Sequence, residues 1–145
     1  MTYCTDIDLL EYRPNILSLG VSEWSNQREN AYSMINRTLE SKWYRQAAIE
    51  LNVDYLEISF DPTLVEAGTL TRLECFKTLE LIYMYLKKDS QQSDGFARLE
   101  QEFRQRYNEE LTTVLGVGLT YDWDQSGDIT YDERFITSPR RLHRA

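Results

Sequence analysis

The strongest constraint on the fold is an apolar stripe with helical spacing in the first third of the chain. Over residues 31–47 an apolar residue stands at every fourth position, and the positions between are mostly polar or charged. Residues four apart share one face of an α-helix. The pattern therefore predicts one long helix from Ser22 or Ser25 to about Leu51. The residues of the stripe are Ala31, Ile35, Leu39, Trp43 and Ala47.

Two later segments also have helical spacing. The first, from about Thr71 to Lys88, has a broad apolar face, and we expect it to be the most buried element. The second, from about Asp94 to Leu115, has an apolar inner face, and the pairs Glu100–Arg104 and Glu102–Arg106 are expected on its outer face. Two glycines then stop this helix. They are Gly116 and Gly118.

Shorter elements complete the predicted fold. Thr5 and Asp8 have the spacing of a capping box and predict a short helix that Pro14 ends. Residues 52–62 break the helical period and predict an extended connector or an edge strand, after which Asp61-Pro62 begins a further helical turn. The expected fold class is mainly α. We expect a small helical bundle over residues 1–118, a loop over 119–134 and an extended basic arm over 135–145.

Composition excludes several classes of protein. The chain has 145 residues, one domain's worth, and a net charge of −8, which argues against nucleic-acid binding by its bulk surface. Its longest apolar stretch, Leu79 to Leu86, is too short to span a membrane, and the acidic opening segment predicts no secretory signal. Cys4 and Cys75 lack metal-ligand spacing and are expected to be free thiols in a reducing compartment.

One loop carries a specific motif. "DWDQSGDITYDE", residues 122–133, matches each position of a twelve-residue calcium loop: side-chain oxygens at the first, third and fifth places, glycine at the sixth and glutamate at the twelfth. All these ligands are protein oxygens in a flexible loop, which favours Ca²⁺ over Mg²⁺. The predicted ligands are Asp122, Asp124, Ser126, Asp128 through its backbone carbonyl, Thr130 directly or through water, and Glu133.

The flanks of the loop differ from those of a paired calcium sensor. Glycines precede it, Pro139 follows soon after, and the chain has no second copy of the motif. A lone loop does not open a groove as paired loops do. Its expected role is therefore to fix the segment that follows it. The alternative is an Asp-rich turn that holds no ion.

The chain ends in a basic segment. "SPRRLHRA", residues 138–145, holds three arginines and no acid, so that the preceding residues carry 13 basic against 24 acidic side chains and a net charge of −11. An acidic body with a basic end suggests an arm that contacts a negatively charged partner, with a solubilising terminus as the alternative. The predicted partner-binding residues are Phe135, Ile136, Arg140, Arg141 and Arg144.

Nothing in the sequence specifies catalysis. The single histidine, His143, stands among arginines with no nucleophile motif beside it, and "GVG" at residues 116–118 lacks the Lys and Ser/Thr of a phosphate-binding loop. An acidic site formed only in the fold remains as a weaker alternative.

In organisation the chain resembles the head-to-tail connector (adaptor, or head completion) proteins of tailed bacteriophages. The resemblance is carried by the opening "TDIDLLEYRP" segment, the long helix that follows, a further pair of helices, and the "GLTYDWDQSGDITYDE" loop with its trailing arm. It covers most of the chain and is strongest at the opening segment and the loop.

The resemblance implies a structural virion protein rather than an enzyme. It implies a ring of identical subunits, a dodecamer, beneath the portal protein in the neck of the virion, assembled in the host cytoplasm. The arm would reach the portal, a downstream neck or tail protein would bind the other side, and DNA would pass through an acidic lumen that repels phosphate. The alternative from the motif alone is a monomeric calcium-binding regulatory or interaction module.

Overall fold

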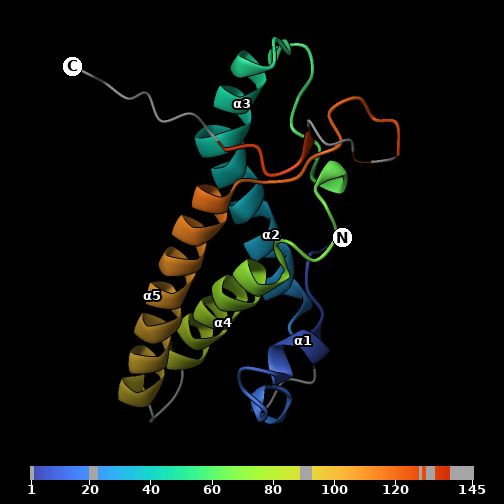
Figure 1. The fold of residues 1–145 in the computed structure, drawn as a ribbon. Coiled ribbons are helices and arrows are strands. Elements are labelled where there is room, and N and C mark those ends of the chain that lie inside the picture. The colour runs from blue at the N-terminus through green and yellow to red at the C-terminus, as the bar shows by residue number, and fades with distance from the viewer. Residues whose placement is uncertain (1, 20–22, 89–92, 128, 130–132, 138–145) are drawn as a thin grey trace, which may run out of the picture. The chain divides into compact units, whose positions relative to one another are not determined.

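The fold is mainly α-helical, as the sequence predicts. The computed structural model describes residues 2–19, 23–88, 93–127, 129 and 133–137. Within these ranges there is no extended sheet, only two isolated antiparallel bridges, and no described helix is long and apolar enough to cross a membrane. The elements (Figure 1) are α1 (Asp6–Leu10), η1 (Ile16–Ser18), α2 (Ser25–Leu39), η2 (Glu40–Tyr44), α3 (Arg45–Glu50), η3 (Pro62–Leu64), α4 (Thr71–Lys88) and α5 (Ser93–Val117).

The long helix predicted from the apolar stripe is confirmed, with one local change of geometry. α2, η2 and α3 follow one another without a break, and η2 is a π-helical turn. In an α-helix, each step of four residues advances about 40° around the axis, so a strict four-residue stripe drifts off one face. A π-helical turn holds more residues and reduces this drift. All five residues of the stripe, on α2, η2 and α3, are fully buried.

The chain divides into two compact units. Unit 1 comprises Met1–Met34 and Leu70–Leu111, and unit 2 comprises Ile35–Thr69 and Thr112–Ala145. Helices α2 and α5 each contribute residues to both units.

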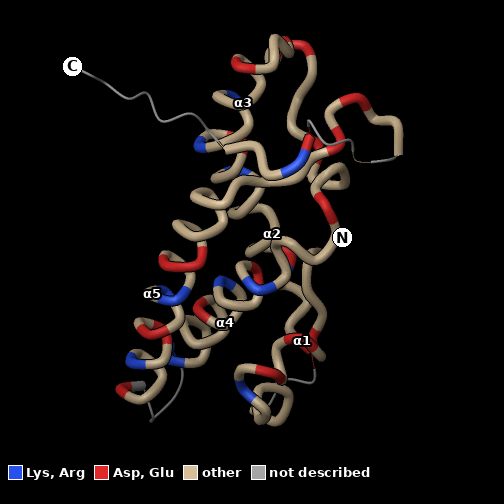
Figure 2. Tube along the Cα trace, viewed as in Figure 1, with Lys and Arg blue, Asp and Glu red and all other residues tan. Residues whose placement is uncertain are grey.

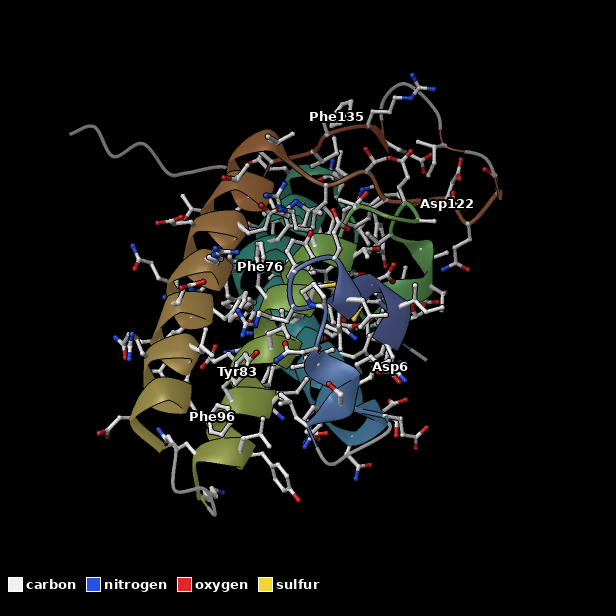
Figure 3. The ribbon with its side chains drawn as sticks, turned by 90° about the horizontal axis from the view of Figure 1, so that it is seen from below. Asp6, Phe76, Tyr83, Phe96, Asp122 and Phe135 are labelled. Atoms are coloured by element: carbon white, nitrogen blue, oxygen red, sulfur yellow. The ribbon has the colours of Figure 1, made fainter. Side chains whose placement is uncertain are left out.

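The core of unit 1 is built on α4, the predicted most buried helix. Its residues Leu73, Leu79, Ile82 and Tyr83 are completely buried, and α5 packs beside it through aromatic contacts. The ring of Phe103 lies 6.0 Å from that of Tyr83, with the two planes only 12° apart. Tyr83 also stacks on Phe96, at 5.9 Å, and Figure 3 shows these two side chains next to each other. The aromatic rings therefore fix how α4 and α5 lie together.

The opening helix is held by the predicted capping box and by an acidic side chain. The Thr5 hydroxyl accepts from the Asp8 N–H at 3.3 Å, and the Asp8 carboxylate accepts from the Thr5 N–H at 2.8 Å. Asp6 joins α1 to the start of α2, because its carboxylate accepts from the backbone of Trp24 and from Arg28 Nε at 3.0 Å.

One charge prediction is wrong. Glu100 was expected on the outer face of α5, yet it is only 4% exposed and faces α4. The predicted Glu100–Arg104 pair is present at 2.9 Å, and Arg104 also binds the buried Glu80 at 3.1 Å. Lys87 pairs with Glu100 as well. Positively and negatively charged residues are interspersed along α4 and α5 (Figure 2). The buried Glu80 and Glu100 are matched by cations from both helices.

A third buried carboxylate lies at the start of α4. Glu74 is completely buried and accepts hydrogen bonds from the backbone N–H groups of Tyr3, at 3.1 Å, and Cys4, at 2.7 Å. Burial raises the pKa of Glu74, and the hydrogen bonds oppose the rise only in part. Cys4 and Cys75 are free, as expected, and both are buried. The pKa of the Cys4 thiol is raised mainly by a hydrogen bond to Cys75 and, to a smaller extent, by burial.

The connector between α3 and α4 is irregular. It consists of turns from Leu51 to Ile58 and the short 3₁₀-helix η3, for which Asp61 caps the N-terminus through the Thr63 N–H at 2.9 Å. The alternative of an edge strand is thus wrong, because residues 52–62 form no strand and no bridge. Exposed aliphatic residues are concentrated at the end of α3 and in this connector. They are Ile49, Leu51, Leu56 and Ile58.

We expect Glu74→Gln to change the pH dependence of stability. A carboxyl group whose pKa is raised on folding contributes stability that is fully present below its unfolded value, 4.5, and is lost as pH rises through the folded value. The free energy of unfolding of the wild-type chain, relative to Glu74→Gln, should therefore fall as pH rises from 4.5. Urea denaturation at several pH values measures this difference. Glu57→Gln, at an exposed position, is the control. A difference that rises with pH would contradict the prediction.

Candidate functional site

The segment that carries the predicted loop is tied to the helices of unit 2 at both of its ends. Leu119 and Ile136 form an antiparallel bridge with N–H to carbonyl distances of 2.9 Å in both directions. The Ile136 carbonyl also accepts from the indole N–H of Trp43, at 2.7 Å. The residues on either side of the loop are therefore joined to each other and to η2.

A second attachment joins the segment to the connector. Glu66 N–H donates to the Thr120 carbonyl, and Asp122 N–H donates to the Leu64 carbonyl, both at 3.0 Å. Val65 and Tyr121 form the bridge between these two bonds. An irregular segment leaves its backbone polar groups without the partners that a helix supplies. These bonds satisfy several of them and fix where the loop begins.

An aromatic cluster lies against the start of the loop. Tyr121 and Trp123 pack with Trp43, Tyr44 and Phe60; Trp123 stacks on Tyr44 with ring centroids 5.4 Å apart and planes 8° apart. The Tyr121 hydroxyl accepts from the Asp61 N–H at 2.9 Å, and burial raises the pKa of Tyr121 to about 12. Trp123, which stands between two predicted ligands in the sequence, is thus covered by its aromatic neighbours.

Three of the predicted ligands come together. Asp122, Asp124 and Glu133 each place a carboxylate oxygen within 4.8 Å of the others. Asp122 and Glu133 are buried, and Asp124 is exposed. Figure 3 shows Asp122 at the start of the loop. Three like charges at this separation repel one another, and a bound cation would remove the repulsion.

The loop backbone organises these carboxylates. Asp122 accepts from the N–H of Ser126, at 3.2 Å, and of Gly127, at 2.9 Å, while Glu133 accepts from the Asp124 N–H at 3.0 Å. Gly127 has φ +90°, a conformation that glycine adopts without strain. Hydrogen bonds from Ser126, first from its hydroxyl and then from its N–H, hold the pKa of the Asp124 carboxyl below its usual value. These hydrogen bonds therefore hold the carboxyl oxygens close together, and Ca²⁺ binds such groups in their deprotonated form.

The remaining predicted residues divide into two groups. Ser126 lies in the loop with its side chain exposed. Phe135 is 61% exposed, whereas Ile136 is half-buried with its backbone paired to Leu119. The other predicted ligands and tail residues lie outside the described residues. They are Asp128, Thr130, Arg140, Arg141 and Arg144.

Gly118 and Phe135 form a close contact at the end of α5. The helix passes through Gly116, which was expected to help stop it, and ends before Gly118, whose N–H donates to the Val114 carbonyl at 3.0 Å. Gly118 has φ +96°, and a Cβ atom there would lie 2.4 Å from the Phe135 carbonyl oxygen. Phe135 itself has φ +51°, a left-handed conformation that is costly for a bulky residue.

Some residues that shape the site carry no signal in the sequence. Trp43 was predicted as a core residue, and nothing in the stripe indicates that its indole N–H binds the Ile136 carbonyl. The Leu64 carbonyl, which holds Asp122, belongs to a backbone group whose partner depends on the fold. The aromatic residues near the loop were the one signal in the sequence for these polar contacts, since the polar groups of buried Tyr and Trp normally find hydrogen-bond partners.

No protein-family model, curated protein or solved structure matches this chain. The site must therefore be interpreted from its own geometry.

We expect two neighbouring glycines to respond oppositely to alanine. Gly118→Ala should lower the free energy of unfolding by at least about 2 kcal/mol, because it combines a disfavoured φ with a clash against Phe135. Gly116→Ala should raise it by about 0.5–1 kcal/mol, because a helical glycine is replaced where a Cβ would meet nothing within 4 Å. Urea denaturation followed by tryptophan fluorescence measures both values. Equal effects of the two substitutions would show that the close contact at Gly118 is absent.

Proposed function

We propose that this chain is a structural virion protein, a head-to-tail connector (adaptor) that forms a ring beneath the portal protein and joins the capsid to the tail. The observation that carries the proposal is the C-terminal segment. It is fixed on both sides of the carboxylate cluster, and it presents the exposed, strained Phe135 directly before the basic terminus. A strained, exposed aromatic at the root of an arm supports a role in partner binding, since such strain is stored at functional positions.

In this proposal the role of the loop is to fix the position of the arm. A Ca²⁺ ion bound by Asp122, Asp124 and Glu133 would stabilise the loop between Tyr121 and Arg134, and so fix the direction in which the arm leaves unit 2. Arg140, Arg141 and Arg144 would pair with carboxylates of the portal, for which the guanidinium fork is well suited. The acidic body would line a lumen through which DNA passes without binding. A downstream neck protein would bind the opposite face of the ring.

The exposed apolar residues of unit 2 support an assembled state. Ile49, Leu56, Val117 and Phe135 are each more than half exposed. Apolar side chains of this size commonly become buried at interfaces between subunits. No catalytic group is required.

Removal of the arm tests the proposal. We expect truncation after Thr137 to leave the melting temperature nearly unchanged while weakening binding to the portal protein of the same phage by at least about tenfold, because charge-assisted contacts are lost. Mass photometry of mixtures with the portal measures ring formation and occupancy.

A charge-matched control separates the arm from general electrostatics. The triple change Arg140→Gln, Arg141→Gln and Arg144→Gln removes three positive charges from the arm. The triple change Arg37→Gln, Lys88→Gln and Arg98→Gln removes three from exposed positions of the body. Only the first should weaken portal binding. An intact chain that forms no complex with the portal would overturn the proposal.

A second function, a calcium-binding interaction module, is favoured by the three clustered carboxylates alone. It predicts a monomer whose shape changes with Ca²⁺ and that binds no portal. Size-exclusion chromatography with and without Ca²⁺, in the presence of the portal, distinguishes the two functions.

We expect the metal to reverse the effect of neutralising the cluster. Without metal, Asp122→Asn and Glu133→Gln should preserve or raise the free energy of unfolding, because they reduce repulsion among the carboxylates. With Ca²⁺ at 100 times its dissociation constant, the wild-type chain should gain about 2.7 kcal/mol and the variants much less. Thermal melting in EDTA and in CaCl₂ measures this reversal, with Glu57→Gln as control.

Terbium provides a direct reading of the same site. Tb³⁺ replaces Ca²⁺ at oxygen sites, and Tyr121 and Trp123 stand on either side of Asp122 in the sequence, close enough to sensitise its emission. Sensitised emission should saturate in the wild-type chain and be lost in Glu133→Gln. A melting curve that EDTA leaves unmoved, together with no saturable emission, would show that the loop holds no ion.

A further inference from the structure

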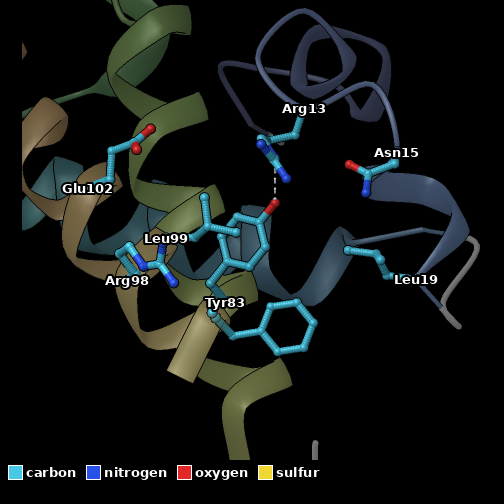
Figure 4. Close-up of a pocket in the computed structure, with 9 residues that line it drawn as sticks. Arg13, Asn15, Leu19, Tyr83, Arg98, Leu99 and Glu102 are labelled. Carbon is cyan, nitrogen blue, oxygen red and sulfur yellow. Dashed lines mark hydrogen bonds between the residues drawn. The ribbon is translucent and has the colours of Figure 1, made fainter. Parts of the chain in front are cut away.

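Unit 1 contains a cavity that the connector function does not use. It has a volume of about 420 Å³ and lies between the segment after α1, helix α4 and the first turns of α5 (Figure 4). Leu19, Phe96 and Leu99 supply apolar walls, and Arg13 and Arg98 supply positive charge. The lining is therefore polar and apolar in nearly equal measure, and the volume lies within the range of about 300–1,000 Å³ that is typical of pockets for small ligands.

Arg13 is held in place at the cavity. Its Nε–H donates to the Tyr83 hydroxyl at 2.8 Å, the bond drawn in Figure 4. Tyr83 is completely buried and stacks on Phe96 and Phe103, so the hydroxyl position is fixed by packing. A neutral hydroxyl does not compensate the guanidinium charge. Within the described part of the chain no carboxylate pairs with Arg13, which leaves its terminal N–H groups for a ligand.

Arg98 adds a second positive charge from α5. Its side chain is exposed, and no ion pair joins it to any residue the structure describes. Glu102 also lines the cavity, but its carboxylate is paired with Arg106 at 3.2 Å. Two arginines therefore stand against one carboxylate in the lining, which gives the cavity a net positive charge in a chain whose net charge is −8. This charge arrangement selects an anion.

We propose that the cavity binds a small aromatic monocarboxylate. The carboxylate is bound by the terminal N–H groups of Arg13, a geometry that favours two parallel hydrogen bonds, and Arg98 provides the second cation. The aromatic ring of the ligand packs against Phe96 and Leu99. Inorganic phosphate would satisfy the arginines but would leave this apolar wall in contact with water, so an acid with a ring fits the cavity better.

The test uses 3-phenylpropionate and its uncharged amide, 3-phenylpropionamide. Titration of the full chain is followed by NMR of the arginine Nε–Hε groups, for which the bonded Nε–H of Arg13 is a direct probe. We expect saturable shifts of Arg13 with the acid, and binding of the amide weaker by at least about tenfold, because the charge-assisted bonds are lost. The same shifts with acid and amide would overturn the proposal.

Two variants locate the binding site. Arg13→Gln and Arg98→Gln should each weaken binding of the acid by about fivefold or more. Arg98 is exposed, so Arg98→Gln should keep the fold. It therefore tests the site even if Arg13→Gln disturbs the fold by removing the Arg13–Tyr83 hydrogen bond. Arg37→Gln, an exposed position of unit 2 with the same charge change, should leave binding unchanged. No saturation of the wild-type chain up to about 10 mM acid, or equal binding by Arg98→Gln, would overturn the proposal.

Discussion

The structure of unit 2 depends on how the backbone of an irregular segment finds partners. The described residues of this segment, 119–127 and 134–137, lie in neither a helix nor a sheet that would satisfy their polar groups, and an unpaired buried N–H or carbonyl costs about 1–3 kcal/mol. The partners come from the Leu64 carbonyl, the Glu66 N–H and the indole of Trp43. Trp43 therefore does more than fill the core. Its N–H fixes Ile136, and through the Leu119–Ile136 bridge it fixes both ends of the loop.

The two units differ in the partners that they provide for their carboxylates. In unit 1 the buried Glu80 and Glu100 are compensated by Arg104 and by lysines, and Glu74 by two backbone N–H groups. In unit 2 the carboxylates of the loop are brought within 4.8 Å of one another, and those of Asp122 accept from backbone N–H groups. Neutral donors orient a carboxylate without cancelling its charge. The contrast with Glu80 and Glu100, which have cationic partners, is the physical basis for proposing a cation at the loop.

The sequence predicted the helices well because their signal is local. The four-residue stripe determined α2 to α3, and the broad apolar face determined α4 from Thr71 to Lys88. The errors arose where a residue's role depends on a distant neighbour. From the sequence of its own helix, Glu100 looks like a surface acid. Its burial depends on an ion pair with Lys87 of α4 in addition to the pair with Arg104. Gly116 looks like a helix stop, yet the stop is at Gly118, where the Phe135 backbone leaves no room for a side chain.

The site was predictable to the extent that it is a contiguous motif. Asp122, Asp124 and Glu133 come together because the loop brings its own first and last residues close. The cavity of unit 1 had no comparable signal, since Arg13, Tyr83 and Arg98 come from three separate elements. The two sites lie in different units and use opposite charges. The proposed binding of a cation at the loop and the proposed binding of a carboxylate in the cavity should consequently be separable, the first removed by Glu133→Gln and the second by Arg98→Gln. A variant that lost both together would have lost its fold rather than either site.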